Sequence, residues 1–289
     1  MEESVEKAWL PIESNPGVMT AYARKLGLPS SLGFHDILST EAWALEMVPQ
    51  PVLAALMLFP IKEASEAHRV EEAARVAAGG LAAPPPQLYY CKQTVSCWPA
   101  GCALARWSLR HELLVWGRLR CGCPPMHTPP FCALSSLSQV GNACGTIGIL
   151  HAVANASTLT GGGIELGSGS WFDRFLRRTL TLDPDARATA LETDVEVEAE
   201  HGEVVAQGQS AVVDDTWQHF IAFVEKDGRL WELDGRKATP IDAGPTTPET
   251  LLADACAAMQ RFMDRDPSEL RFTMVAMAAA GEEEEEEED

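Results

Sequence analysis

The chain has 289 residues and a formal net charge of −20 at pH 7. Such an acidic surface argues against nucleic-acid binding, because phosphate backbones attract basic surfaces, and it favours a basic protein partner. The first ten residues contain three glutamates and no apolar block, so no signal peptide is expected. The longest apolar run, 51–61, is far shorter than the roughly 20 residues that span a bilayer, so no membrane association is expected.

The first quarter of the chain predicts a mixture of helices and one buried strand. We expect an extended arm over 9–16, followed by helices near 18–26 and 41–46. The continuous apolar run 52–59 is typical of a buried strand. The segment 64–78 is rich in alanine and charge, and is either helical or mobile.

A linker over 79–86 precedes an expected strand, 88–94, which carries Gln93. The segment 97–141 that follows differs in composition from the rest of this acidic chain. It holds five of the eight cysteines and three of the eight tryptophans, but no lysine and no aspartate. Apart from this segment and the acidic tail 282–289, we expect a single domain over 1–281.

Three interpretations of segment 97–141 stay open: a translated intron or gene-model error, a genuine looped-out insertion, and a small zinc site. The zinc interpretation uses Cys121, Cys123, His127 and Cys132, which are suitable ligand types. The Cys-x-Cys spacing lacks the usual spacer of two to four residues, so we predict no metal. The three cysteines outside the segment are too few for a disulfide framework, which fits a reducing compartment.

Cys144 opens an apolar stretch that ends near Asn155, and we expect a helix that is apolar on nearly every side. A thiol in the first turn of a helix faces unpaired backbone N–H groups and the positive end of the dipole. Both lower the pKa of the thiol and favour the nucleophilic thiolate. The alternative is an inert buried cysteine. His151, on the same helix, is interpreted as a packed core histidine.

After this helix we expect further helices over 171–180 and from Asp183 to about 192, and then a loop over 194–214 that shows little periodicity. A helix over 248–263 and a last strand over 270–277 close the domain.

Between the expected loop 194–214 and the expected helix 248–263, two runs rich in aromatic and β-branched residues flank Asp227-Gly228. This pattern is typical of a two-residue hairpin turn. This turn places His219 and Asp234 on the same face, one diagonal step apart. An aspartate that orients an imidazole, which in turn deprotonates a thiol, would suit this spacing. A surface histidine and an ordinary turn aspartate are the alternative. The register pairs Lys226 with Arg229, Val224 with Trp231 and His219 with Arg236.

Seven short blocks occur in an order similar to that of the ubiquitin carboxyl-terminal hydrolase family of short, single-domain thiol peptidases. These are Trp-Leu-Pro-Ile-Glu-Ser-Asn-Pro at 9–16, Met-Val-Pro-Gln-Pro-Val at 47–52, Lys-Gln-Thr-Val at 92–95, Asn-Ala-Cys-Gly-Thr-Ile-Gly at 142–148, His-Phe-Ile-Ala at 219–222, Glu-Leu-Asp-Gly-Arg at 232–236 and Phe-Met-Asp-Arg-Asp-Pro at 262–267. The resemblance implies a papain-like α/β (α+β) fold with a mainly antiparallel central sheet flanked by helices.

The resemblance also implies the roles of four residues. Cys144 would be the nucleophile, His219 the general base, Asp234 the residue that orients the histidine, and Gln93 the side-chain donor to the oxyanion. In the family only about two residues separate Lys-Gln-Thr from Asn-Ala-Cys, whereas 47 residues separate Thr94 from Asn142 here, so about 45 are extra.

By resemblance, the substrate is ubiquitin, or a ubiquitin-like protein, that carries a small adduct or peptide on its C-terminal glycine. The segment 194–214 corresponds to a loop that crosses above the cleft and limits the size of the leaving group, although a plain connection is equally compatible with its composition. Glu13 and Asp36 align with positions near the substrate, and could equally be ordinary exposed acids. We expect a cytoplasmic monomer, with the nucleus as a further location, and no cofactor. The main alternative is a chain that binds ubiquitin without cleaving it, because the extra segment disrupts the oxyanion site.

Overall fold

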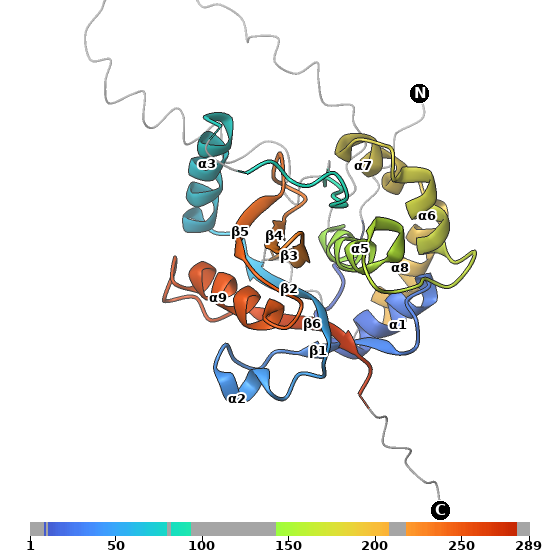
Figure 1. Cartoon of the computed structure of the whole chain (residues 1–289), viewed down its shortest axis with the longest axis horizontal. Helices are drawn as coiled ribbons and strands as arrows, with labels where there is room; N and C mark the ends of the chain where they lie inside the picture. Colours follow the sequence, from blue (N-terminus) through green and yellow to red (C-terminus); the bar gives the residue numbers. More distant parts are fainter. Residues whose placement is uncertain (1–8, 10, 80–81, 94–142, 208–217, 282–289) are drawn as a thin grey trace, which may run out of the picture.

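The computed structural model describes residues 9, 11–79, 82–93, 143–207 and 218–281. The expectations for 97–141 and 282–289 lie outside these residues. One antiparallel sheet of six strands, in the order β1-β6-β2-β3-β4-β5, organises the described part of the chain (Figure 1). The strands are β1 (Leu32–Asp36), β2 (Val52–Pro60), β3 (Gln218–Lys226), β4 (Arg229–Leu233), β5 (Ile241–Pro245) and β6 (Thr273–Ala279).

The central strand β2 pairs with β6 on one side and with β3 on the other. Its sequence is apolar throughout, as expected for a strand that is covered on both faces. Because successive side chains alternate between faces, Leu56 and Leu58 join one core cluster, whereas Met57 and Phe59 join the other. The sheet is therefore a middle layer between two hydrophobic cores.

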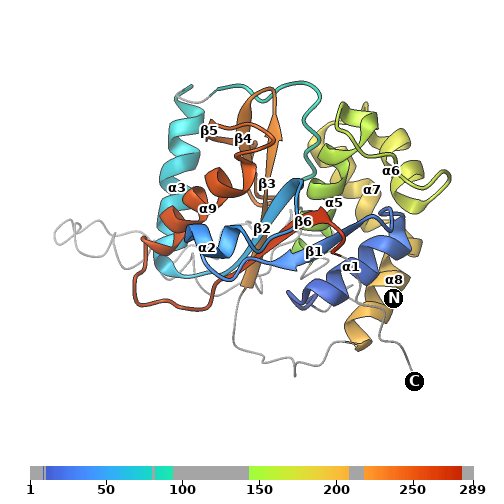
Figure 2. The same cartoon turned by 60° about the horizontal axis from the view of Figure 1, so that its bottom comes forward.

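Helices cover both faces of the sheet. Figures 1 and 2 show α9 on one side, and α5, α6 and α7 on the other. The described helices are α1 (Pro16–Leu26), α2 (Ala42–Leu45), α3 (Glu63–Ala77), α5 (Cys144–Ala156), α6 (Trp171–Thr179), α7 (Pro184–Glu192), α8 (Val195–Gln207) and α9 (Leu251–Met263). The expected antiparallel sheet flanked by helices is confirmed, and none of these helices is long and apolar enough to cross a membrane.

Local capping explains several helix boundaries. In α1 the side chain of Asn15 accepts a hydrogen bond from the backbone N–H of Val18, and Gly27 ends the helix with φ of 114°. In α7 the side chain of Asp183 accepts from two backbone N–H groups, which confirms the predicted start. The segment 64–78, predicted as helical or mobile, lies almost wholly in α3.

Two of the predicted elements are wrong. The described residues of 88–94 form no strand, because side chains of α5 take the hydrogen-bonding groups that a neighbouring strand would otherwise use. The expected loop 194–214 contains α8 instead. Asp194 begins that helix by accepting from the backbone N–H groups of 196 and 197, and Val197 and Val204 are buried on one side of it. The strands β1 and β5 were not predicted.

Candidate active site

Cys144 is the first residue of α5, the helix that packs against β2 and β3. Cys144 is 5% exposed, and every residue of α5 is buried. Ala143, at the N-cap, has no side chain that could cap the first turn, so the backbone N–H groups of that turn are not satisfied from this position. The helix N-terminus therefore stabilises negative charge at the sulfur.

The other two described cysteines lie in environments that suppress reactivity. Burial raises the pKa of the Cys91 thiol to about 12 and that of Cys256 to about 11. Both therefore stay protonated near neutral pH, and a protonated thiol is a poor nucleophile. Cys144 is thus the best placed of the three described cysteines to act as a nucleophile.

The β3–β4 hairpin brings His219 and Asp234 together. Asp227 and Gly228 have φ of 52° and 73°, the left-handed pair that a tight hairpin turn of this type needs. The predicted pairs Lys226–Arg229 and Val224–Trp231 are confirmed. The ladder ends at the pair Ala222–Leu233, so the predicted pairing of His219 with Arg236 is wrong. The predicted proximity holds, because Nε2 of His219 lies 2.6 Å from Oδ1 of Asp234.

The His219–Asp234 pair is almost completely buried. Burial on its own would raise the pKa of Asp234, but the neighbouring His219 and Lys237 and a hydrogen bond from the backbone N–H of Arg236 hold it below its usual range. Asp234 therefore carries its negative charge throughout the neutral pH range. A buried carboxylate in this position fixes the orientation of the imidazole ring.

The backbone of Gln93 lies directly against the turn that follows Asp234. The N–H of Gln93 donates to the carbonyl oxygen of Gly235 at 2.8 Å. A Cβ at position 235 would lie 3.0 Å from both N and Cβ of Gln93, and 3.4 Å from Cγ2 of Ile147, three residues after Cys144. A side chain at position 235 would push against these neighbours, so glycine suits the close approach of the segment of Gln93, the turn after Asp234 and the first turn of α5.

The side chains of α5 also hold the segment that leads to Gln93. The amide of Asn155 accepts from the N–H of Tyr89 at 2.8 Å and donates to its carbonyl at 2.9 Å. Nε2 of His151 lies 3.0 Å from both N and O of Cys91. His151 is fully buried and stacks on Tyr90, which confirms its interpretation as a core histidine.

We expect His151 to make the protein less stable as the pH falls from 7 to 5. Burial lowers the pKa of His151 to about 4, against about 6.5 in an unfolded chain. A depressed pKa means that its contribution is full above pH 6.5 and is lost progressively as the pH falls toward 4. The loss between pH 7 and pH 5 is about 2 kcal/mol. Urea unfolding at the two pH values measures it, and a His151→Gln variant with an undiminished loss would contradict the assignment.

The two candidate substrate-binding acids lie in different parts of the fold. Glu13 follows Ile12, whose side chain packs over Gly145 at the start of α5, where an added Cβ would lie only 3.1 Å from Cβ of Ile12. Asp36 is exposed at the end of the edge strand β1. Glu13 is thus near the nucleophile along the N-terminal arm, whereas Asp36 lies on a strand three places from β3.

Sequence reasoning missed a buried ion-pair cluster beside the site. The ammonium group of Lys237 contacts the carboxylates of Glu72 on α3 and Glu232 on β4, and all three side chains are buried. Glu232 interrupts an apolar run, and this pattern could have indicated a paired buried acid. Glu72 gave no such signal, because α3 contains several glutamates of similar spacing.

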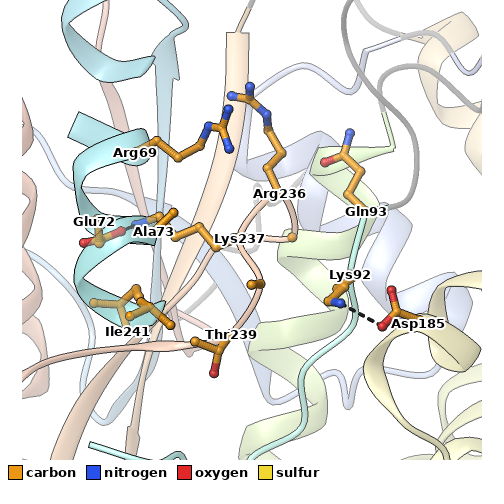
Figure 3. A pocket seen from close by; sticks show the side chains of 13 residues that line it. Arg69, Glu72, Ala73, Lys92, Gln93, Asp185, Arg236, Lys237, Thr239 and Ile241 are labelled. Atoms are coloured by element: carbon orange, nitrogen blue, oxygen red, sulfur yellow. Dashed lines mark hydrogen bonds and ion pairs between the residues drawn. The ribbon is translucent and has the colours of Figure 1, made fainter. Parts of the chain in front are cut away.

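A pocket of about 380 Å³ adjoins Gln93 (Figure 3). It lies between α3, the segment 92–93 and the turn that follows Asp234. Within the described ranges, no group of three or more histidine, cysteine, aspartate or glutamate side chains could hold a metal ion. The residues of the zinc interpretation, in 97–141, lie outside those ranges.

The fold is similar to that of two solved structures from Trichinella spiralis. One is described as the UCH37 catalytic domain bound to ubiquitin vinyl methyl ester, with a TM-score of 0.60, 16% identity, and coverage of 94% of this chain and 96% of that chain. The other, described as UCH37 bound to the same compound, has a TM-score of 0.58 and 16% identity, and covers 94% of this chain and 82% of that one. At this identity the likeness shows the fold, and it agrees with the predicted papain-like α/β class.

Matches of higher identity show the class of protein, a cysteine-type hydrolase. Ubiquitin carboxyl-terminal hydrolase 3 of Arabidopsis thaliana is 34% identical over 278 residues, or 96% of this chain and 97% of the relative. Isozyme L1 of Rattus norvegicus is 31% identical over 270 residues, or 93% and 98%. The family described as ubiquitin carboxyl-terminal hydrolase, family 1, matches residues 9–106 and 138–264. The chain belongs to this family of thiol peptidases.

Proposed function

We propose that this chain is a deubiquitinating hydrolase that releases small adducts or peptides from the C-terminal glycine of ubiquitin. Family membership supports the activity, and the relatives carry it in their names. The observation that carries the assignment of residues is the buried His219–Asp234 contact of 2.6 Å on the hairpin next to α5, the helix that Cys144 opens.

The proposed reaction has two halves. The Cys144 thiolate attacks the carbonyl carbon of the terminal glycine, and the amide of Gln93 and the backbone N–H of Cys144 donate to the oxyanion. His219 gives a proton to the leaving amine or thiol as the bond to it breaks, which leaves a thioester on Cys144. His219 then takes a proton from water, the hydroxide attacks the thioester, and ubiquitin leaves with a free carboxylate. This chemistry needs no metal or cofactor.

Asp234 would act through His219. Its carboxylate accepts the hydrogen bond from Nε2 of the imidazole, so that Nδ1 is the nitrogen that exchanges a proton with Cys144. The same carboxylate also stabilises the imidazolium that forms when the thiol is deprotonated. The low pKa of Asp234 keeps both effects available at neutral pH.

Ubiquitin is the proposed partner, and ubiquitin-like proteins could bind in the same way. The net charge of −20 would attract a basic tail over long range. Glu13 and Asp36 are the proposed contacts of that tail, because one lies on the N-terminal arm beside α5 and the other is exposed at the end of β1. A cytoplasmic or nuclear monomer is part of this proposal.

A second candidate function is ubiquitin binding without hydrolysis. It is favoured by the position of the extra segment 97–141, which lies in the sequence between Gln93 and Cys144, two residues that must act on one oxygen atom. The family match omits residues 107–137, within that segment. Loss of a single oxyanion donor typically lowers the rate about 100- to 1000-fold.

Hydrolysis of a ubiquitin–fluorophore amide separates the two functions. We expect release of the fluorophore by the full chain and by a variant that lacks 97–141, since the described residues that surround the site are anchored to one another without that segment. Ubiquitin affinity is measured on both chains. Activity in the shortened chain alone, with equal affinity, would favour the binding function for the full chain. Inactivity of both chains would reject the enzymatic proposal.

A further inference from the structure

The pocket beside Gln93 has both charged and apolar lining, and its charged lining includes the ion pair between Lys92 and Asp185. Arg69 of α3 and Arg236 of the turn after Asp234 both line it and direct their guanidinium groups toward each other (Figure 3). Ala73, Val76 and Ile241 provide apolar lining. A ligand that fits these walls has a short aliphatic part and an anionic group.

Arg69 and Arg236 give this pocket an excess of positive charge, because Lys92 and Asp185, which also line it, neutralise each other. Arg69 and Arg236 share a single carboxylate, Glu66, with N–O distances of 2.9 Å to each guanidinium. The side chains of Arg69 and Arg236 are 33% and 18% exposed, so an incoming group can reach both. The opposite charges around Lys237 are buried and engaged with one another. Two partly exposed guanidinium groups that share one carboxylate therefore have the capacity to bind a second one.

The place of the pocket indicates which part of a substrate reaches it. Gln93, the proposed oxyanion donor, and Gly235 form one of its walls. Ile241, on another wall, begins β5 at one edge of the sheet, whereas Asp36 lies on β1 at the opposite edge. If ubiquitin occupies the side of Glu13 and Asp36, the chain that follows its terminal glycine continues past Gln93 toward this pocket.

We propose that this pocket is the leaving-group subsite and that it favours adducts whose leaving group carries a carboxylate. The inference rests on the proposed hydrolase function and adds to it a preferred chemical class of adduct. Acidic amino acids and short acidic peptides joined to the terminal glycine of ubiquitin are such adducts. The carboxylate of the leaving group would bind between Arg69 and Arg236, beside the carboxylate of Glu66.

The test compares two adducts that differ by one charge: ubiquitin joined through its terminal glycine to glutamic acid amide, and ubiquitin joined to glutamine amide. We expect kcat/KM to be about fivefold higher for the glutamic acid adduct. Arg69→Gln should reduce this ratio to about one, because Glu66 would then balance Arg236. Arg69→Lys, which keeps the charge, should preserve most of it. Arg75→Gln makes the same change on α3 outside the pocket and should leave the ratio intact.

Binding to the Cys144→Ala chain provides a readout that does not depend on turnover. The glutamic acid adduct should have the lower dissociation constant. This difference should disappear when Arg69→Gln is added to the Cys144→Ala chain. Hydrolysis of both adducts at equal rates would overturn the subsite and leave the hydrolase function in place. Selective binding without hydrolysis would support the subsite and reject the hydrolase. If the ratio of the two kcat/KM values were the same in Arg69→Gln and Arg75→Gln, the subsite would be overturned. Failure of either adduct to bind would overturn both proposals.

Discussion

Replacement of Cys144 by alanine is expected to abolish hydrolysis of a ubiquitin–fluorophore amide, with a loss in kcat on the order of 10⁵-fold. The reason is that no other described thiol combines a position at a helix N-terminus with contact to the β3 side of the sheet. Release of the fluorophore measures turnover, and titration with ubiquitin measures binding, which the change should preserve. The substitution removes one small side chain from a buried site, so a folding control is needed.

Cys256→Ala is the matched control for this substitution. Cys256 is also buried, but it lies in α9 on the other face of the sheet, and its pKa is raised to about 11. Its removal should leave kcat essentially unchanged. Turnover that survives in the Cys144→Ala chain, or is lost in both chains to the same degree, would contradict the assignment of the nucleophile.

Replacement of Asp234 by asparagine should lower kcat by about 10⁴-fold, as when the aspartate of a serine protease triad becomes asparagine. The amide NH₂ can donate to Nε2 of His219, which favours the tautomer with its proton on Nδ1. That tautomer cannot accept the proton of Cys144. Turnover of the same fluorescent substrate measures the effect, and urea unfolding shows whether the variant still folds.

A matched control for this change is Asp242→Asn. Asp242 lies on β5 and forms an ion pair with Arg229 at 2.6 Å, in the same sheet but outside the site. This variant should keep its activity, because the pair joins β4 and β5, whereas α5 packs against β2 and β3, and because the pair is partly exposed on the Arg229 side. Comparable losses of kcat in the two variants would mean that Asp234 contributes to folding and not to the orientation of His219.

The elements that sequence predicted best are those specified by short-range rules. Asp227-Gly228 determines the hairpin turn, and the turn determines the register that brings His219 and Asp234 together. The continuous apolar pattern of β2 was equally informative, since a short run of this kind has no stable place outside a core. Both signals lie within a few residues of the feature that they predict.

The elements that sequence missed depend on contacts between distant residues. The segment 88–93 has the composition of a strand, yet its backbone is bound by Asn155, 66 residues later, so propensity gave the wrong answer. In α8 the buried residues are few and lie among glutamates and small residues, so the helical period was hidden. The edge strands β1 and β5 are short and contain glycine, which weakens any signal for a strand.

Asn155 and His151 hold residues 89–91 by hydrogen bonds, so the two halves of the site stay together whatever the length of chain that connects them. The backbone that carries Gln93 and the helix that carries Cys144 are held together by noncovalent contacts between described residues. Extending a connection between two such points from about six to about fifty residues costs on the order of 2 kcal/mol in closure entropy. A few buried hydrogen bonds offset that amount. An insertion at this point in the gene can thus lower the stability of the fold without changing the geometry of the reacting groups.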